Sequence, residues 1–113
     1  MSHFAIAGLQ LNLKSRGNLD YVLDKIKYTK KRYPFVKMIV CSELAICGAG
    51  KGFAEPKLHE VTTVLCEVAK ELSIWLVPGS IHEIDGDQTF NTAIVINPAV
   101  SYTHLTLPTR IFV

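Results

Sequence analysis

Glu43 is the residue of this sequence best placed to do chemistry. It follows the apolar run Met38–Cys41 and precedes a second apolar stretch, Leu44–Ile46, which leads into a glycine-rich segment. Removing a carboxylate from water is costly unless the group is paired with a partner or used in a reaction. Burial also raises the pKa of a carboxyl group toward the range in which a general base works near neutral pH. We therefore interpret Glu43 as a candidate general base at the end of a buried strand.

Three cysteines, Cys41, Cys47 and Cys66, are the other candidates for covalent chemistry. Cys41 lies two residues before Glu43, so on a strand the two side chains would share a face and could form a nucleophile–base pair. Free cysteine is among the most buried residue types, and we favour a core thiol instead. The odd number and the lack of a C-x-x-C pair are typical of reduced thiols, which predicts a cytoplasmic protein.

The glycine-rich segment Gly48–Gly52 invites comparison with phosphate-binding loops. A P-loop requires Ser or Thr after its lysine, but Lys51 is followed by another glycine, and Ala45 occupies the position of the first glycine. The dinucleotide pattern G-x-G-x-x-G fails at Phe53. The segment still suits a flexible loop at the carboxyl end of a strand, where α/β sites assemble. A small ligand- or nucleotide-binding module using this loop is therefore the alternative function.

Other function classes find little support in composition and spacing. His3, His59 and His82 show no metal-ligand spacing with one another or with a cysteine, so we expect no metal and no other cofactor. The net charge of the 113-residue chain is only +2, and the basic cluster over 25–32 lacks an aromatic platform, which argues against nucleic acid as a partner. Neither a signal peptide nor an apolar run long enough to cross a bilayer is present, so no membrane partner is expected.

Alternating strand and helix patterns must position these residues. We expect strands over 4–13, 35–45, 74–84 and 90–96, helices over 19–32 and 58–72, and a loop over 47–57. The near-continuous apolarity of the first strand predicts burial on both of its faces. Asn18 suits the N-cap of the first helix, and Asp85-Gly86 predicts a tight turn between the last two strands. The order β-α-β-α-β-β predicts an α/β domain with a largely parallel sheet and a final antiparallel hairpin.

With these elements placed, residues 4–98 resemble the N-terminal part of the nitrilase, or carbon-nitrogen hydrolase, superfamily. The motifs that carry the resemblance are FAIAGLQLN at the first strand, SELAICG around Glu43, and VPGSIHEIDGDQTFNTAIVINP over the hairpin, which includes Asn91. Glu43 and Gly48 keep the family's spacing of five residues, whereas Ser42 replaces the usual proline and Ala49 stands where an aromatic residue often follows the glycine.

The resemblance implies the N-terminal part of an α-β-β-α sandwich and a Glu-Lys-Cys mechanism. Glu43 would accept a proton from a cysteine thiol, and the thiolate would attack an amide or nitrile carbon of a small-molecule substrate. A lysine would stabilise the charge that develops in the transition state. In the family both the lysine and the cysteine follow the fourth strand, beyond Pro98. We therefore expect an intact parent that is a homo-oligomeric hydrolase of non-peptide carbon-nitrogen bonds, and an inactive 113-residue chain.

The last residues have a different origin. Residues 100–109, VSYTHLTLPT, match one reading frame of a transposon-derived sequencing adapter, residue for residue. We interpret 99–113 as a non-native tail and 1–98 as a truncated carbon-nitrogen hydrolase domain, the alternative being a real strand. Half a sandwich would leave one sheet face uncovered, and large exposed apolar patches favour aggregation. The chain alone should therefore dissolve poorly.

Overall fold

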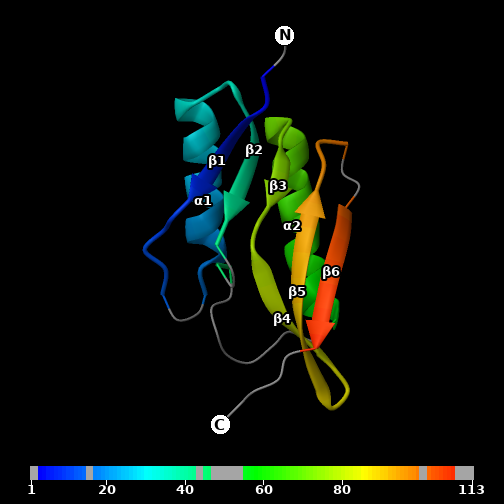
Figure 1. Cartoon of the computed structure of the whole chain (residues 1–113). Helices are drawn as coiled ribbons and strands as arrows, with labels where there is room; N and C mark the ends of the chain where they lie inside the picture. The colour runs from blue at the N-terminus through cyan, green and yellow to red at the C-terminus, as the bar shows by residue number, and fades with distance from the viewer. Residues whose placement is uncertain (1–2, 15–16, 43–44, 47–54, 100–101, 109–113) are drawn as a thin grey trace.

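The computed structural model has two layers, one of helices and one of strands, and it describes residues 3–14, 17–42, 45–46, 55–99 and 102–108 (Figure 1). The elements are β1 (Ala5–Leu9), α1 (Leu19–Arg32), β2 (Val36–Cys41), α2 (Glu55–Leu72), β3 (Trp75–Val77), β4 (Ser80–Asp85), β5 (Gln88–Ile96) and β6 (Tyr102–Pro108). The predicted α/β class is confirmed, and the first four elements follow the predicted order. The structure then has four strands where two were predicted, because the third predicted strand forms both β3 and β4 and because residues 102–108 form β6.

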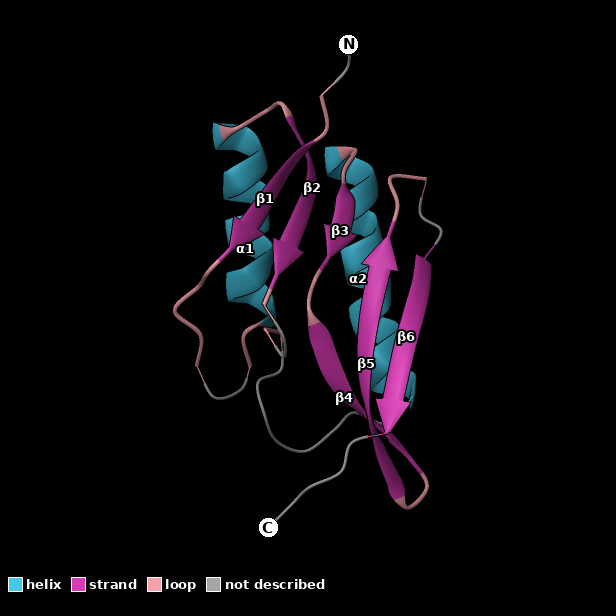
Figure 2. Ribbon diagram, in the orientation of Figure 1, coloured by secondary structure: helices cyan, strands magenta, loops and turns pink. Residues whose placement is uncertain are grey.

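The sheet is parallel in its first half and antiparallel in its second (Figure 2). The prediction of a largely parallel sheet is therefore wrong, since three of the five strand pairings are antiparallel. β1 pairs with β2, and β2 with β3, in parallel; β5 then runs antiparallel to β3, β4 and β6. Parallel neighbours need a crossover connection, and α1 and α2 provide it on one face. The carboxyl ends of β1, β2 and β3 consequently meet at one edge of the sheet, where α/β proteins assemble their sites.

The third predicted strand, over 74–84, is broken into β3 and β4 at Pro78-Gly79. Both pieces pair with β5, with Leu76 opposite Ile96 and Ser80 opposite Ala93. Three residues separate the first pair from the second along β3–β4, but only two along β5, so one extra residue is accommodated as a bulge. Proline lacks a ladder donor and Gly79 has a φ of +93°, which explains why pairing is interrupted there.

The core lies between the helices and one face of the sheet. Because apolar residues recur at helical spacing, each helix presents one apolar stripe to that face. The fully buried residues of this core include Val22, Ile26, Ile39, Leu65, Ala69, Ile74, Leu76 and Ile96. Lys30, in the last turn of α1, links this helix to the start of β2: its Nζ donates to the carbonyl oxygens of Pro34 and Val36, each at 2.7 Å.

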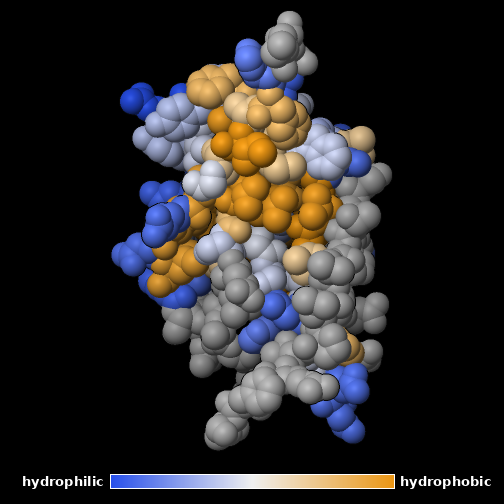
Figure 3. Space-filling view, viewed as in Figure 1, coloured by the Kyte–Doolittle hydropathy of each residue, from blue (hydrophilic) through white to orange (hydrophobic). Residues whose placement is uncertain are grey.

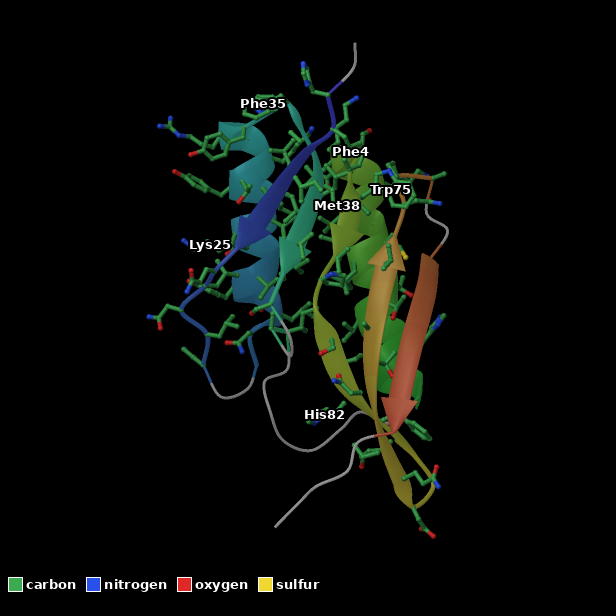
Figure 4. The ribbon with its side chains drawn as sticks, in the orientation of Figure 1. Phe4, Lys25, Phe35, Met38, Trp75 and His82 are labelled. Atoms are coloured by element: carbon green, nitrogen blue, oxygen red, sulfur yellow. The ribbon has the colours of Figure 1, made fainter. Side chains whose placement is uncertain are left out.

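None of the described helices or strands covers the opposite face of the sheet (Figure 1). In register across β1, β2 and β3, Ile6 aligns with Met38 and Trp75. Ile6 is 59% exposed and Trp75 37% exposed, and Phe4, just before β1, is 51% exposed. Figure 3 shows the resulting apolar patch in the middle of this face, and Figure 4 shows Phe4, Met38 and Trp75 along it. The prediction that the first strand is buried on both faces is therefore wrong for this chain, because both helices lie on the other side.

Helix boundaries follow the predictions more closely than strand boundaries. α1 begins directly after Asn18, as predicted, although the Asn18 side chain makes no capping bond. α2 begins at Glu55, so the predicted loop is wrong over its last three residues; Pro56 suits a first helical turn, where no main-chain donor is needed. β1 ends at Leu9 and β2 at Cys41, each four residues earlier than predicted.

The predicted hairpin between β4 and β5 is confirmed, with its turn displaced by one residue. Asp85 pairs with Gln88, so the two loop residues are Gly86 and Asp87 rather than Asp85 and Gly86. Gly86 has a φ of +61°, and a glycine with positive φ at the first loop position is typical of a type II′ turn.

The tail forms an edge strand. β6 pairs antiparallel with β5 from Phe90 opposite Pro108 to Ile96 opposite Tyr102. A β ladder is built from main-chain groups, which carry almost no information about sequence. Such pairing is open to native and non-native segments alike, so the adapter interpretation of residues 99–113 stays a prediction.

Candidate functional site

Glu43 lies outside the residues that the structure describes, as do Cys47 and the Gly48–Gly52 loop. Its surroundings are described through three neighbours, Ser42 on one side and Ala45 and Ile46 on the other. These neighbours follow the carboxyl end of β2. Ala45 is fully buried and Ile46 is 3% exposed, so this part of the post-strand segment belongs to the core.

Gly79 closes one side of this segment. A Cβ atom built on Gly79 would overlap the carbonyl oxygen of Ser42 and would lie 3.5 Å from the Cβ of Ala45. The same carbonyl oxygen accepts a hydrogen bond from the Ala45 amide at 3.2 Å. Only glycine combines this close approach with a φ of +93° at no steric cost. The bulge between β3 and β4 therefore lies directly against the carbonyl group of Ser42, the residue that precedes Glu43.

Asn18 contacts the same segment through Ile46. Its main-chain amide donates to the carbonyl oxygen of Ile46 at 2.8 Å. Its side chain forms two hydrogen bonds with the main chain of Lys14, accepting at Oδ1 from the amide (2.9 Å) and donating from Nδ2 to the carbonyl (2.8 Å). Asn18 is only 2% exposed, and buried polar groups need such partners. Sequence reasoning assigned Asn18 to helix capping and missed this role, because the contact with Ile46 is not local.

The buried thiols behave as core residues. Burial raises the pKa of Cys41 to about 11, and it raises the pKa of Cys66 as well. The thiolate is the nucleophilic form, and at pH 7 a thiol with a pKa of about 11 is ionised to roughly one part in ten thousand. These observations favour the interpretation of Cys41 as a core thiol over its pairing with Glu43.

His59 and His82 lie on different elements, α2 and β4, and His3 precedes β1. His82 is half-buried on β4, directly opposite Asn91 of β5, and Figure 4 shows it near the lower end of the sheet. His59 is exposed on α2, where its carbonyl oxygen accepts a bond from the Thr63 hydroxyl at 2.9 Å. Among the described residues, no group of three or more histidine, cysteine and acidic side chains could hold a metal ion. Neither of the two described helices is long and apolar enough to cross a membrane.

Comparison with known proteins identifies the family. The sequence profile of the family described as carbon-nitrogen hydrolase matches residues 4–109. Omega-amidase NIT2 of Danio rerio is 36% identical over 104 residues, which cover 87% of this chain and 37% of that protein. Nit3 of Saccharomyces cerevisiae, from branch 10 of the nitrilase superfamily, superposes with a TM-score of 0.77 at 24% identity, covering 91% of this chain and 43% of that one.

An amidase from Nesterenkonia sp. has the same fold, with a TM-score of 0.74 at 19% identity over 95% of this chain and 43% of that one. The chain thus spans less than half the length of each of these relatives. The structural matches agree with the predicted N-terminal part of a nitrilase-like α/β fold, and the profile covers nearly every residue. This chain belongs to the carbon-nitrogen hydrolase family.

Proposed function

We propose that this chain is the N-terminal part of an enzyme that hydrolyses the carbon-nitrogen bond of small amides, with Glu43 as its general base. The observation that carries the proposal is the anchoring of the segment around Glu43 at the carboxyl end of β2, between Asn18 and Gly79. A general base must be held within hydrogen-bond reach of the proton that it removes. The described neighbours of Glu43, which are Ser42, Ala45 and Ile46, are held at the sheet edge where α/β sites assemble, and this supports the proposal.

The reaction proceeds through a covalent intermediate. Glu43 accepts the proton of a cysteine thiol, and the thiolate attacks the amide carbon. As the tetrahedral intermediate collapses to a thioester, Glu43 passes its proton to the leaving nitrogen, and ammonia or an amine is released. Water then attacks the thioester while the Glu43 carboxylate accepts its proton. Collapse of the second tetrahedral intermediate releases the carboxylic acid, and Glu43 returns the proton to the cysteine sulfur. A lysine ammonium stabilises the oxyanion in both steps. A glutamate-to-leucine mutant of the Nesterenkonia amidase carries the acetamide moiety of fluoroacetamide covalently at its active site cysteine, which supports a cysteine nucleophile in this fold.

The nucleophile and the lysine come from a longer parent protein in this proposal. Cys41 and Cys66 are buried thiols with raised pKa values, so neither suits the role. We place both missing groups beyond Pro98, where the family's sequence continues, and we treat residues 99–113 as non-native. The parent would also supply the layer that covers the open face of the sheet, and it would act on small-molecule amides in the cytoplasm as a homo-oligomer. The 113-residue chain by itself should be inactive.

The first test is genetic and enzymatic. An adapter-free read downstream of codon 98 should continue in frame and encode a lysine and a cysteine; a stop codon there would end the proposal. The full-length protein should release ammonia from a short aliphatic amide such as butyramide. Glu43→Gln should lower kcat by roughly 10²–10⁴-fold, the range typical of a general base. Glu60→Gln, the same change at an exposed position of α2, is the matched control and should leave kcat unchanged.

A further inference from the structure

We infer that Gly79 and Asn18 are positioning residues for the proposed general base, because they hold Ser42 and Ile46, which lie on either side of Glu43 in the sequence. The inference rests on the proposed role of Glu43. Neither Gly79 nor Asn18 would touch the substrate; each would act through the main chain next to Glu43. Ser42 immediately precedes Glu43 and Ile46 follows it by three positions, and each of these carbonyl groups faces one of the two anchors.

The Gly79 anchor is rigid because of where it lies. Pro78 before it and Ser80 after it are buried, and the strands on either side are paired, β3 with β2 and β5, and β4 with β5. A methyl group on Gly79 has no free space on the side of Ser42, since it would overlap the carbonyl oxygen. The overlap involves main-chain atoms, which cannot rotate away as the end of a side chain can. Any side chain here must therefore displace either the bulge or Ser42.

The Asn18 anchor joins the segment to the first helix. The Asn18 amide binds the Ile46 carbonyl, and the Asn18 carbonyl accepts the first helical hydrogen bond, from the Val22 amide at 2.8 Å. The side chain meanwhile fixes the preceding loop through both main-chain groups of Lys14. One buried residue thus connects the loop after β1, the start of α1 and the segment after β2.

Small movements of this segment should have large kinetic effects. Misplacing a catalytic group by about 1 Å can lower the rate by roughly 10²-fold. Displacement also changes the surroundings of the carboxyl group, and therefore the ionisation that governs the acid limb of the kcat/KM profile. Substitution of a residue that contributes only to folding would lower the free energy of unfolding. It would leave the acid limb of the kcat/KM profile unchanged in the molecules that remain folded.

The kinetic test compares two glycines that share a positive φ. Gly79 (φ +93°) faces Ser42, whereas Gly86 (φ +61°) has no atom within 4 Å of the Cβ position. In the full-length enzyme, Gly79→Ala should lower kcat by about 10–100-fold and shift the acid limb of kcat/KM. Gly86→Ala should change kcat by less than about twofold and leave the acid limb in place. Folded Gly79→Ala enzyme with unchanged kcat and acid limb would overturn the inference.

A second arm separates this inference from the proposed function. In the full-length protein, hydrogen exchange over 42–46 should be about tenfold faster in Gly79→Ala than in either wild type or Gly86→Ala. If Gly79→Ala does not fold, Asn18→Asp replaces it, because Asp keeps the acceptor for the Lys14 amide and loses the donor. Unchanged exchange in a folded variant refutes the anchoring. Full activity of Glu43→Gln refutes the proposed function while leaving the exchange result to stand by itself.

Discussion

The two faces of the sheet are built from similar residues and have opposite environments. Ile39 on the helix-covered face is fully buried, whereas Ile6 on the open face is 59% exposed. β1 and β2 place apolar side chains on both faces, a pattern typical of parallel sheets covered on both sides. The comparison teaches that the composition of a strand records how many layers its sheet was selected to contact, whether or not the chain at hand provides them.

The largest expected effect comes from making one substitution on each face. Ile39→Ala should lower the free energy of unfolding by about 3 kcal/mol, because it removes buried methyl groups and leaves a cavity. Ile6→Ala removes the same atoms from an exposed position and should cost well under about 1 kcal/mol. Urea denaturation followed by circular dichroism measures both. Equal losses would show that the open face is covered, for example by self-association.

The free energy of unfolding should depend on pH because Cys41 is buried on the helix-covered face of the sheet. Burial raises its pKa from the ordinary 9.0 to about 11, so as the pH rises the unfolded chain releases this proton first. The stability is therefore intact below pH 9 and falls between about pH 9 and 11, by at most about 2.7 kcal/mol. Cys41→Ala should flatten this part of the curve.

The adjacent Val40 offers the matched control for the thiol. It lies on the open face, in register with Val77 of β3, and Val40→Cys in a Cys41→Ala background places a thiol there. That thiol should react with a disulfide reagent at pH 8 faster than Cys41 does, because the thiolate is the reactive form. Equal reaction rates in the folded chain would contradict the assignment of the two faces.

The smallest effect on stability should come from a charge on the open face. Ile6→Lys in the 113-residue chain should change the free energy of unfolding by less than about 0.5 kcal/mol, since the site is exposed. It should nevertheless increase the soluble, monomeric fraction measured by light scattering, by interrupting the apolar patch. In the full-length enzyme the same variant should be strongly destabilised, because the second layer would bury the charge. A wild-type chain that is already monomeric at high concentration would remove the basis for this difference.

Much of the fold could be predicted from local pattern. The start of α1 after Asn18, its end before Pro34, and the hairpin around Gly86 follow from residues close together in the sequence. The break at Pro78-Gly79 was missed because the apolar pattern of the strand continues across it. The exposure of Ile6 was missed because apolarity predicts burial, while burial itself depends on a covering layer.

The sequence by itself determined the period of each element, the class of the fold and the family, since these depend on local propensity and on motif spacing. Tertiary structure alone decided which face of the sheet is covered. It also decided that Gly79 meets Ser42 and that Asn18 meets Ile46. These contacts join segments far apart in the chain, and they exist only after both crossovers have closed and brought the segments to the carboxyl edge of the sheet.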